Sequence, residues 1–141
     1  MNSARLKINP LHNWDLSPEA AIALQQDLRD QIMLTDDFDS IHHVAGGDVG
    51  FEADGTVTRA AVAVLTLDGL KLVDRAIARR PTTFPYIPGL LSFREVPAVL
   101  DALAKLTIIP DLLLVDGMGT AHPRRFGIAC HLGLLTQLPA L

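Results

Sequence analysis

Residues 41–79 have the sequence IHHVAGGDVGFEADGTVTRAAVAVLTLDGLKLVDRAIAR, and the architecture follows from this stretch. Runs rich in Val, Ala and Ile alternate with short polar segments that contain the turn-forming pairs Asp54-Gly55 and Asp68-Gly69. Strands joined by such tight turns form an antiparallel meander. The expected strands are Ile41 to Phe51, Val57 to Leu67 and Leu70 to Arg79.

The segments on either side of this meander have the patterns of helices and of one further strand. Ser17-Pro18-Glu19 predicts the start of a helix that ends near Met33, because Ser caps a first turn and Pro fits the first helical position. Pro81 to Gly89 contains three prolines, which exclude a helix or a central strand. Further along, we expect a helix at Ser92 to Leu106, a strand buried on both faces at Asp111 to Asp116, and a helix from about Arg124 to Thr136.

This order of elements predicts an α/β fold. Three antiparallel strands followed by a parallel strand would form a mixed sheet with flanking helices. Of the 141 residues, 49% are hydrophobic and 20% are charged, so we assign residues 1–141 to a single globular domain. The net charge of −4 excludes binding of nucleic acid through bulk positive charge, but it does not exclude a nuclease whose carboxylates bind metal.

The cysteine content and the apolar runs bear on location. Cys130 is the only cysteine in the sequence, so an internal disulfide is impossible and a reducing, cytoplasmic location is expected. The longest apolar runs have the length of strands, so we expect no membrane partner.

Two aspartates lie among glycines at the ends of apolar strands. Asp48 lies within Gly46-Gly-Asp-Val-Gly50, and Asp116 precedes Gly117-Met-Gly119. If the two strands are neighbours, both carboxylates lie near one end of the sheet, where glycines let a ligand approach closely. A hard divalent ion prefers such oxygen ligands and can activate water against a phosphodiester. The alternative is that each aspartate is an ordinary turn or cap residue.

Glu95 also has two interpretations. In Ser92-Phe-Arg-Glu95 the spacing fits a capping box, in which Glu95 would bond back to the backbone of Ser92. Spacing alone favours this cap over a role in chemistry.

Taken together, several segments resemble the endonuclease V family of repair nucleases for deaminated bases. The resemblance runs from about Asp27 to Pro139, and its most specific part is Pro85-Tyr-Ile-Pro-Gly89 followed by Ser92-Phe-Arg-Glu95. The segments, which occur in the family's order and spacing, are Gly46–Phe51, Thr58–Val64, Pro85–Gly89, Leu91–Glu95, Val115–Gly117 and His122–Arg125.

The resemblance implies a ribonuclease H-like fold and a site in which Asp48, Glu95 and Asp116 bind Mg²⁺, or Mn²⁺ in its place. Glu95 then becomes a ligand and not a cap. The implied activity is a nick in DNA at the second phosphodiester on the 3′ side of deoxyinosine and other deaminated bases. Some relatives prefer inosine in RNA, so inosine-containing RNA is a further candidate partner, and we expect a monomer.

Residues 85–89, which we call the wedge segment, are similar to the family's wedge. Its residues are Pro85, Tyr86, Ile87, Pro88 and Gly89. Tyr86 would contact the strand beside an extruded base, where prolines stiffen the loop and an aromatic ring replaces lost stacking. The alternative for Tyr86 is a loop aromatic that packs on the core.

Three further residues, His122, Arg124 and Arg125, are candidates for binding DNA phosphates at the start of the last expected helix. The alternatives are a histidine that caps a loop and arginines that are solvated surface charges.

Two features depart from the family pattern. Met118 stands where the family usually has His or Asn, so a polar contact near the metal is expected to be lost. The family also continues past Leu141 with another strand, a lysine-bearing segment and a further acidic or histidine residue. We therefore interpret the chain as truncated, with the last strand and helices missing. The alternative is a short natural protein with a frayed tail.

These departures leave three functional hypotheses. The first is the Mg²⁺-dependent repair endonuclease. The runner-up is a truncated, non-catalytic remnant with weak nucleic-acid or metal binding. A third, another ribonuclease H-like phosphotransferase, explains the carboxylates but not the wedge segment.

Overall fold

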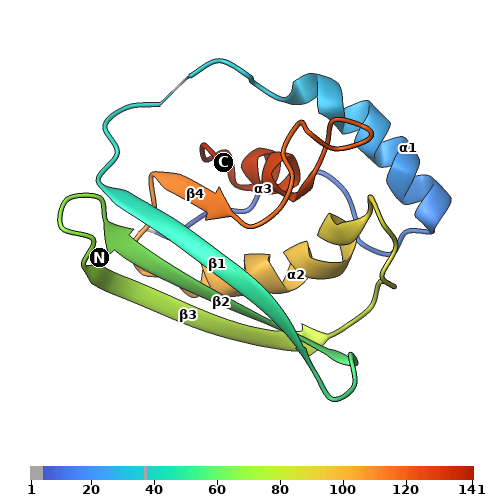
Figure 1. The fold of residues 1–141 in the computed structure, drawn as a ribbon, viewed down its shortest axis with the longest axis horizontal. Coiled ribbons are helices and arrows are strands. Elements are labelled where there is room, and N and C mark those ends of the chain that lie inside the picture. Colours follow the sequence, from blue (N-terminus) through green and yellow to red (C-terminus); the bar gives the residue numbers. More distant parts are fainter. Residues whose placement is uncertain (1–4, 37) are drawn as a thin grey trace.

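The computed structural model describes residues 5–36 and 38–141. In these residues the helices and strands follow the predicted order, and the strands form one mixed sheet (Figure 1). The elements are α1 (Pro18–Leu28), the short 3₁₀ helix η1 (Arg29–Gln31), β1 (His43–Glu52), β2 (Val57–Thr66), β3 (Leu72–Pro81), α2 (Leu91–Ala104), β4 (Leu112–Val115) and α3 (Ile128–Thr136).

The sheet has the strand order β3-β2-β1-β4. β1 pairs with β2, and β2 with β3, in antiparallel directions, whereas β4 runs parallel to β1. This confirms the predicted meander with one added parallel strand. The turn at residues 53–56 closes with a hydrogen bond of 3.1 Å from the N–H of Gly55 to the carbonyl of Glu52, and Gly55 has the positive φ of 86° that favours glycine.

The core lies between the sheet and helices α2 and α3. β2 buries every second side chain, as the period of two requires. These residues are Thr58, Ala60, Val62 and Val64. Ala60, Val62 and Val64 pack against the apolar face of α2, which includes Val96 and Leu103.

The starts of α1 and α2 differ in how they are capped. Ser17 Oγ accepts a hydrogen bond of 3.1 Å from the N–H of Ala20, which confirms the predicted cap of α1. The α-helix ends at Leu28, earlier than expected, and continues as η1. α2 begins at Leu91, and within the described residues no side chain caps its amino end, so the capping-box interpretation of Glu95 is wrong.

The last helix begins at Ile128 and not near Arg124. Gly127 packs against the loop after β4, where a side chain would overlap the backbone carbonyl of Met118. The N–H of Gly127 donates to the carbonyl of Gly119 at 3.0 Å, and the N–H of Ala129 donates to that of Met118 at 3.1 Å. This contact fixes where α3 can start. The expectation that Arg124 and Arg125 lie at the start of a helix is therefore wrong, because both lie in the preceding loop.

Residues 139–141 extend along the outer edge of β4. The N–H of Leu113 donates to the carbonyl of Pro139 at 2.9 Å, and the N–H of Leu141 donates to that of Leu113 at 2.9 Å. The bridge between Leu113 and Ala140 is parallel. As for membranes, no helix in residues 5–36 and 38–141 has the length and apolar content needed to span one.

Candidate active site

The parallel pairing of β1 and β4 brings two aspartates to the same end of the sheet. Gly47 pairs with Val115 at the last step of this ladder. Asp48 and Asp116 each follow by one residue, so their side chains leave neighbouring strands at one place. The condition on which the sequence-based interpretation rested, that the two strands are neighbours, is confirmed.

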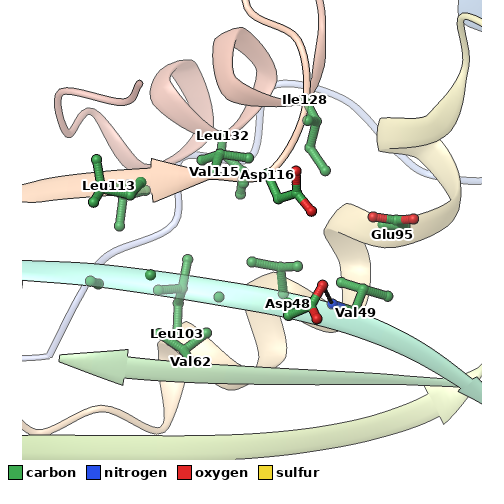
Figure 2. A pocket seen from close by; sticks show the side chains of 15 residues that line it. Asp48, Val49, Val62, Glu95, Leu103, Leu113, Val115, Asp116, Ile128 and Leu132 are labelled. Carbon is green, nitrogen blue, oxygen red and sulfur yellow. Dashed lines mark hydrogen bonds between the residues drawn. The ribbon is translucent and has the colours of Figure 1, made fainter.

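Glu95 reaches the same place from α2. Asp48, Glu95 and Asp116 line one pocket, and Figure 2 shows their carboxylates around a shared space. The rest of the lining is Gly46 and Gly47 together with apolar side chains of the sheet and of helices α2 and α3. These apolar residues include Val49, Val62, Val99, Leu103, Leu113, Val115, Ile128 and Leu132.

The glycines beside Asp48 differ in how much room they leave. An added Cβ at Gly46 would meet none of the described atoms within 4 Å, so this side of the pocket is open. At Gly47 an added Cβ would lie 3.0 Å from the carbonyl oxygen of Ala61, so this glycine lets β1 and β2 approach. The expected close approach of a ligand to the backbone is therefore possible at Gly46.

The pocket concentrates negative charge. Burial raises the pKa of Glu95, and the nearby carboxylates of Asp48 and Asp116 raise it further, while the Arg94 guanidinium opposes the shift. Asp48 Oδ1 accepts a hydrogen bond of 2.9 Å from the N–H of Val49. In the described part of the chain, no three acidic, histidine or cysteine side chains are close enough to hold one ion.

The wedge segment presents its tyrosine to solvent. The side chain of Tyr86 is 69% exposed, so the alternative that it packs on the core is wrong. Phe84 and Leu90, on either side of the segment, are 5% and 1% exposed and anchor it. Arg94 donates to the Phe84 carbonyl at 3.1 Å and stacks 4.3 Å from the centre of the Phe51 ring.

His122, Arg124 and Arg125 have different surroundings. His122 is buried; its Nε2 lies 2.7 Å from the carbonyl oxygen of Gly89, and its Nδ1 accepts from the N–H of Arg124 at 3.0 Å. Arg124 Nη2 also donates to the Gly89 carbonyl, at 3.0 Å. Arg125 is exposed and lines a separate pocket with Arg29. The structure thus brings His122 and Arg124 to the wedge segment, in agreement with the loop-capping alternative for His122, and leaves Arg125 at the surface.

Sequence reasoning missed one residue of this region. Gln25 of α1 is 1% exposed and donates from Nε2 to the Gly89 carbonyl at 2.9 Å. Its buried position follows Ala21 by four residues and precedes Leu28 by three, which is the spacing of one helix face. That spacing is the signal that could have identified it.

The antiparallel meander, the parallel fourth strand and the acidic residues at their junction define a ribonuclease H-like α/β protein. The family model described as Endonuclease V matches residues 26–141. The chain belongs to the endonuclease V family.

Relatives of known sequence or structure agree with this family. The chain is 56% identical over 131 residues to the endonuclease V of Nostoc punctiforme. The aligned region covers 92% of this chain and 59% of that protein. The crystal structure of the Streptomyces avermitilis endonuclease V superposes with a TM-score of 0.85 at 42% identity, over 97% of this chain and 60% of that one.

A third relative was solved with nucleic acid. The Ciona intestinalis endonuclease V, in complex with a 23mer DNA containing an inosine followed by a ribo-adenosine, superposes with a TM-score of 0.80 at 29% identity, over 89% of this chain and 57% of that one. The chain therefore spans about three fifths of the length of the relatives that it matches.

Proposed function

We propose that this chain is the nuclease domain of a metal-dependent repair endonuclease that nicks DNA at the second phosphodiester on the 3′ side of deoxyinosine and other deaminated bases. The observation that carries the proposal is the convergence of Asp48, Glu95 and Asp116 on one pocket at the junction of β1 and β4. Family membership and the inosine-containing DNA bound to the Ciona intestinalis relative support this substrate.

Mg²⁺ is the ion that we propose for this pocket, with Mn²⁺ as a substitute. The donor set fits a hard divalent ion, because the pocket offers carboxylate oxygens, and burial together with the charges of Asp48 and Asp116 raises the pKa of Glu95. When bound, such an ion supplies an activated water and offsets charge on the leaving oxygen of a phosphodiester. Asp48, Glu95 and Asp116 are the proposed ligands, and a positive ion would relieve their mutual repulsion.

The other candidate residues divide into two roles in this proposal. Tyr86, exposed on the wedge segment, would contact the strand beside an extruded base, and Arg125 would bind a phosphate from the surface loop. His122 and Arg124 would act on DNA through the wedge segment, since both bond its last carbonyl. Hydrolysis would leave 5′-phosphate and 3′-hydroxyl ends, and we propose that the protein acts as a monomer in the cytoplasm.

A cleavage assay tests the proposal. The purified chain is incubated with Mg²⁺ and a labelled DNA strand containing one deoxyinosine, beside an undamaged strand and an inosine-containing RNA. Asp48→Ala removes a proposed ligand, and Asp68→Ala, at an exposed turn between β2 and β3, is the matched control. The expected result is one nick, 3′ of deoxyinosine, that depends on Mg²⁺, is lost in Asp48→Ala and is retained in Asp68→Ala.

Other outcomes discriminate between the hypotheses. Cleavage of the RNA alone would keep the metal site and change the substrate. A folded chain that binds Mg²⁺ and inosine-containing DNA without cutting either nucleic acid would support the second candidate, a non-catalytic binding module. One observation favours that candidate, namely that the three carboxylates are not drawn together as metal ligands. Equal cleavage by Asp48→Ala and the wild-type chain would refute the proposed site.

A further inference from the structure

One carbonyl, that of Gly89 at the end of the wedge segment, accepts hydrogen bonds from two distant parts of the chain. Gln25 Nε2 donates to it at 2.9 Å from α1. His122 Nε2, at 2.7 Å, and Arg124 Nη2, at 3.0 Å, reach it from the loop before α3. In Figure 1, α1 and this loop lie beside the connection between β3 and α2, so segments far apart in sequence meet there.

The bonds among these donors fix each of them in place. Gln25 Oε1 accepts from Arg124 Nε at 2.6 Å, so Gln25 and Arg124 hold each other as well as the carbonyl. His122 Nδ1 accepts from the N–H of Arg124, which places its proton on Nε2, the atom that faces Gly89. We call Gln25, His122 and Arg124 the carbonyl clamp.

The backbone of Gly89 is shaped for this clamp. Its φ is 84°, a conformation that favours glycine. An added Cβ would lie 2.7 Å from Arg124 Nη2 and 3.7 Å from His122 Nε2, so a side chain at this position would displace the donors. Gln25 is 1% exposed, and its amide bonds are therefore made without competition from water.

We propose that Gln25 is a positioning residue for the wedge segment. Through the Gly89 carbonyl and Arg124 it holds the end of the segment, and so sets where the exposed Tyr86 ring stands relative to a bound strand. The family match begins at residue 26, so this role belongs to a helix that lies mostly before the matched region. The effect on DNA rests on the proposed function, whereas the effect on the loop does not.

Hydrogen exchange of the free chain tests the effect on the loop. Gln25→Met keeps the length and packing of the side chain and removes both amide bonds. Gln26→Met, at the exposed neighbouring position of the same helix, is the matched control. Loss of these buried bonds is expected to speed exchange of the Leu90 amide, which donates to the Ile87 carbonyl at 2.9 Å, by about tenfold or more in Gln25→Met. Unchanged exchange in a folded Gln25→Met chain would overturn the proposal.

A double-mutant cycle tests the effect on DNA. The probe is a duplex with 2-aminopurine beside deoxyinosine, whose fluorescence rises when stacking is lost, in EDTA to prevent cleavage. Gln25→Met is expected to weaken binding and to reduce the rise, and to have no added effect when Tyr86 is already Ala. A role in packing alone would instead add to Tyr86→Ala, which would overturn the positioning role.

The hydrogen-exchange and fluorescence experiments separate the positioning role of Gln25 from the proposed DNA function. If the wild-type chain gives no rise with deoxyinosine, the proposed DNA function fails, and exchange alone then decides whether the clamp holds the segment.

Discussion

His12 and His131, which are 119 residues apart in sequence, lie with their Nε2 atoms 2.7 Å apart. His12 Nδ1 lies 2.6 Å from the carbonyl oxygen of Asn13 and donates to it. His131 Nδ1 lies 2.8 Å from Ser92 Oγ, within hydrogen-bonding distance. These contacts tie the amino-terminal segment to α3 and to the start of α2, the helix that carries Glu95.

The buried position of His131 predicts that the folded protein loses stability in acid. Burial, together with the smaller effect of neighbouring His12, lowers the pKa of His131 to about 3. The unfolded chain, with an ordinary histidine pKa near 6.5, therefore binds a proton in the window between these values that the folded chain does not. The contribution of His131 is full above pH 6.5, and it falls by about 1.4 kcal/mol per pH unit as the pH drops through this window. Urea unfolding at several pH values measures it.

The matched variants for this measurement are two histidine-to-glutamine changes. His131→Gln removes the titrating group and is expected to flatten the pH dependence between pH 6.5 and 4.5. His42→Gln, at an exposed position, is expected to keep the wild-type slope. The same slope in all three proteins would show that His131 is not the source.

Glu95→Gln is expected to stabilise the free protein and to abolish cleavage. The change removes a partly buried charge that faces two aspartates, so the unfolding midpoint should rise in EDTA. Mg²⁺ should raise the midpoint of the wild-type chain but not that of the variant, because binding stabilises only the state with the full site. The cleavage rate should fall by at least about 100-fold, because mutation of residues that only hydrogen-bond to metal ligands already lowers activity by up to about 100-fold. A midpoint that falls in EDTA would contradict the proposed repulsion.

Two glycine-to-alanine changes are expected to have opposite effects. In Gly127→Ala the new side chain overlaps the Met118 carbonyl, so we expect a loss of about 1–3 kcal/mol. In Gly133→Ala, inside α3, the new Cβ meets its nearest neighbour at an ordinary 3.6 Å, so we expect a gain of about 0.5–1 kcal/mol. Thermal unfolding of both variants checks the pair. Equal shifts would mean that the contact between Gly127 and Met118 does not define the start of α3.

Asp74 is expected to be a stabilising link between β3 and the connection that precedes β4. Its Oδ2 accepts from the N–H groups of Ile108 at 3.0 Å and Thr107 at 2.7 Å, bonds that hold the pKa of Asp74 below its usual value. Asp74→Ala should cost about 1 kcal/mol, because the site is partly open to solvent. In contrast, Asp68→Ala should leave the unfolding free energy unchanged. The Asp74 contribution should also decline as the pH falls below about 4.

The parts of the fold that could be predicted from sequence are those with local causes. The turn at Asp54-Gly55, the alternation along β2 and the cap at Ser17 each depend on a few neighbouring residues. The sequence did not specify that β4 lies beside β1; the predicted site only assumed that these strands are neighbours. The pairing of Gly47 with Val115 confirms this assumption.

The features that could not be predicted from sequence depend on contacts between distant segments. The start of α3 is set by Met118 across the loop, and no local pattern before Ile128 indicates it. The capping-box spacing of Glu95 was misleading because α2 starts earlier, at Leu91. The carbonyl clamp joins Gln25 to Gly89 across 64 residues, a pairing that a helical pattern around Gln25 cannot specify.

The pairing of residues 139–141 with β4 has a consequence for self-association. β4 has hydrogen-bonded neighbours on both sides, whereas β3 stands last in the described strand order and has β2 on one side. Val73 and Ile77 of β3 are exposed, and their apolar side chains would favour association between molecules. Arg75 lies between them, and Pro81 ends the strand without an N–H to donate. Charge and proline together discourage β3 from templating aggregation.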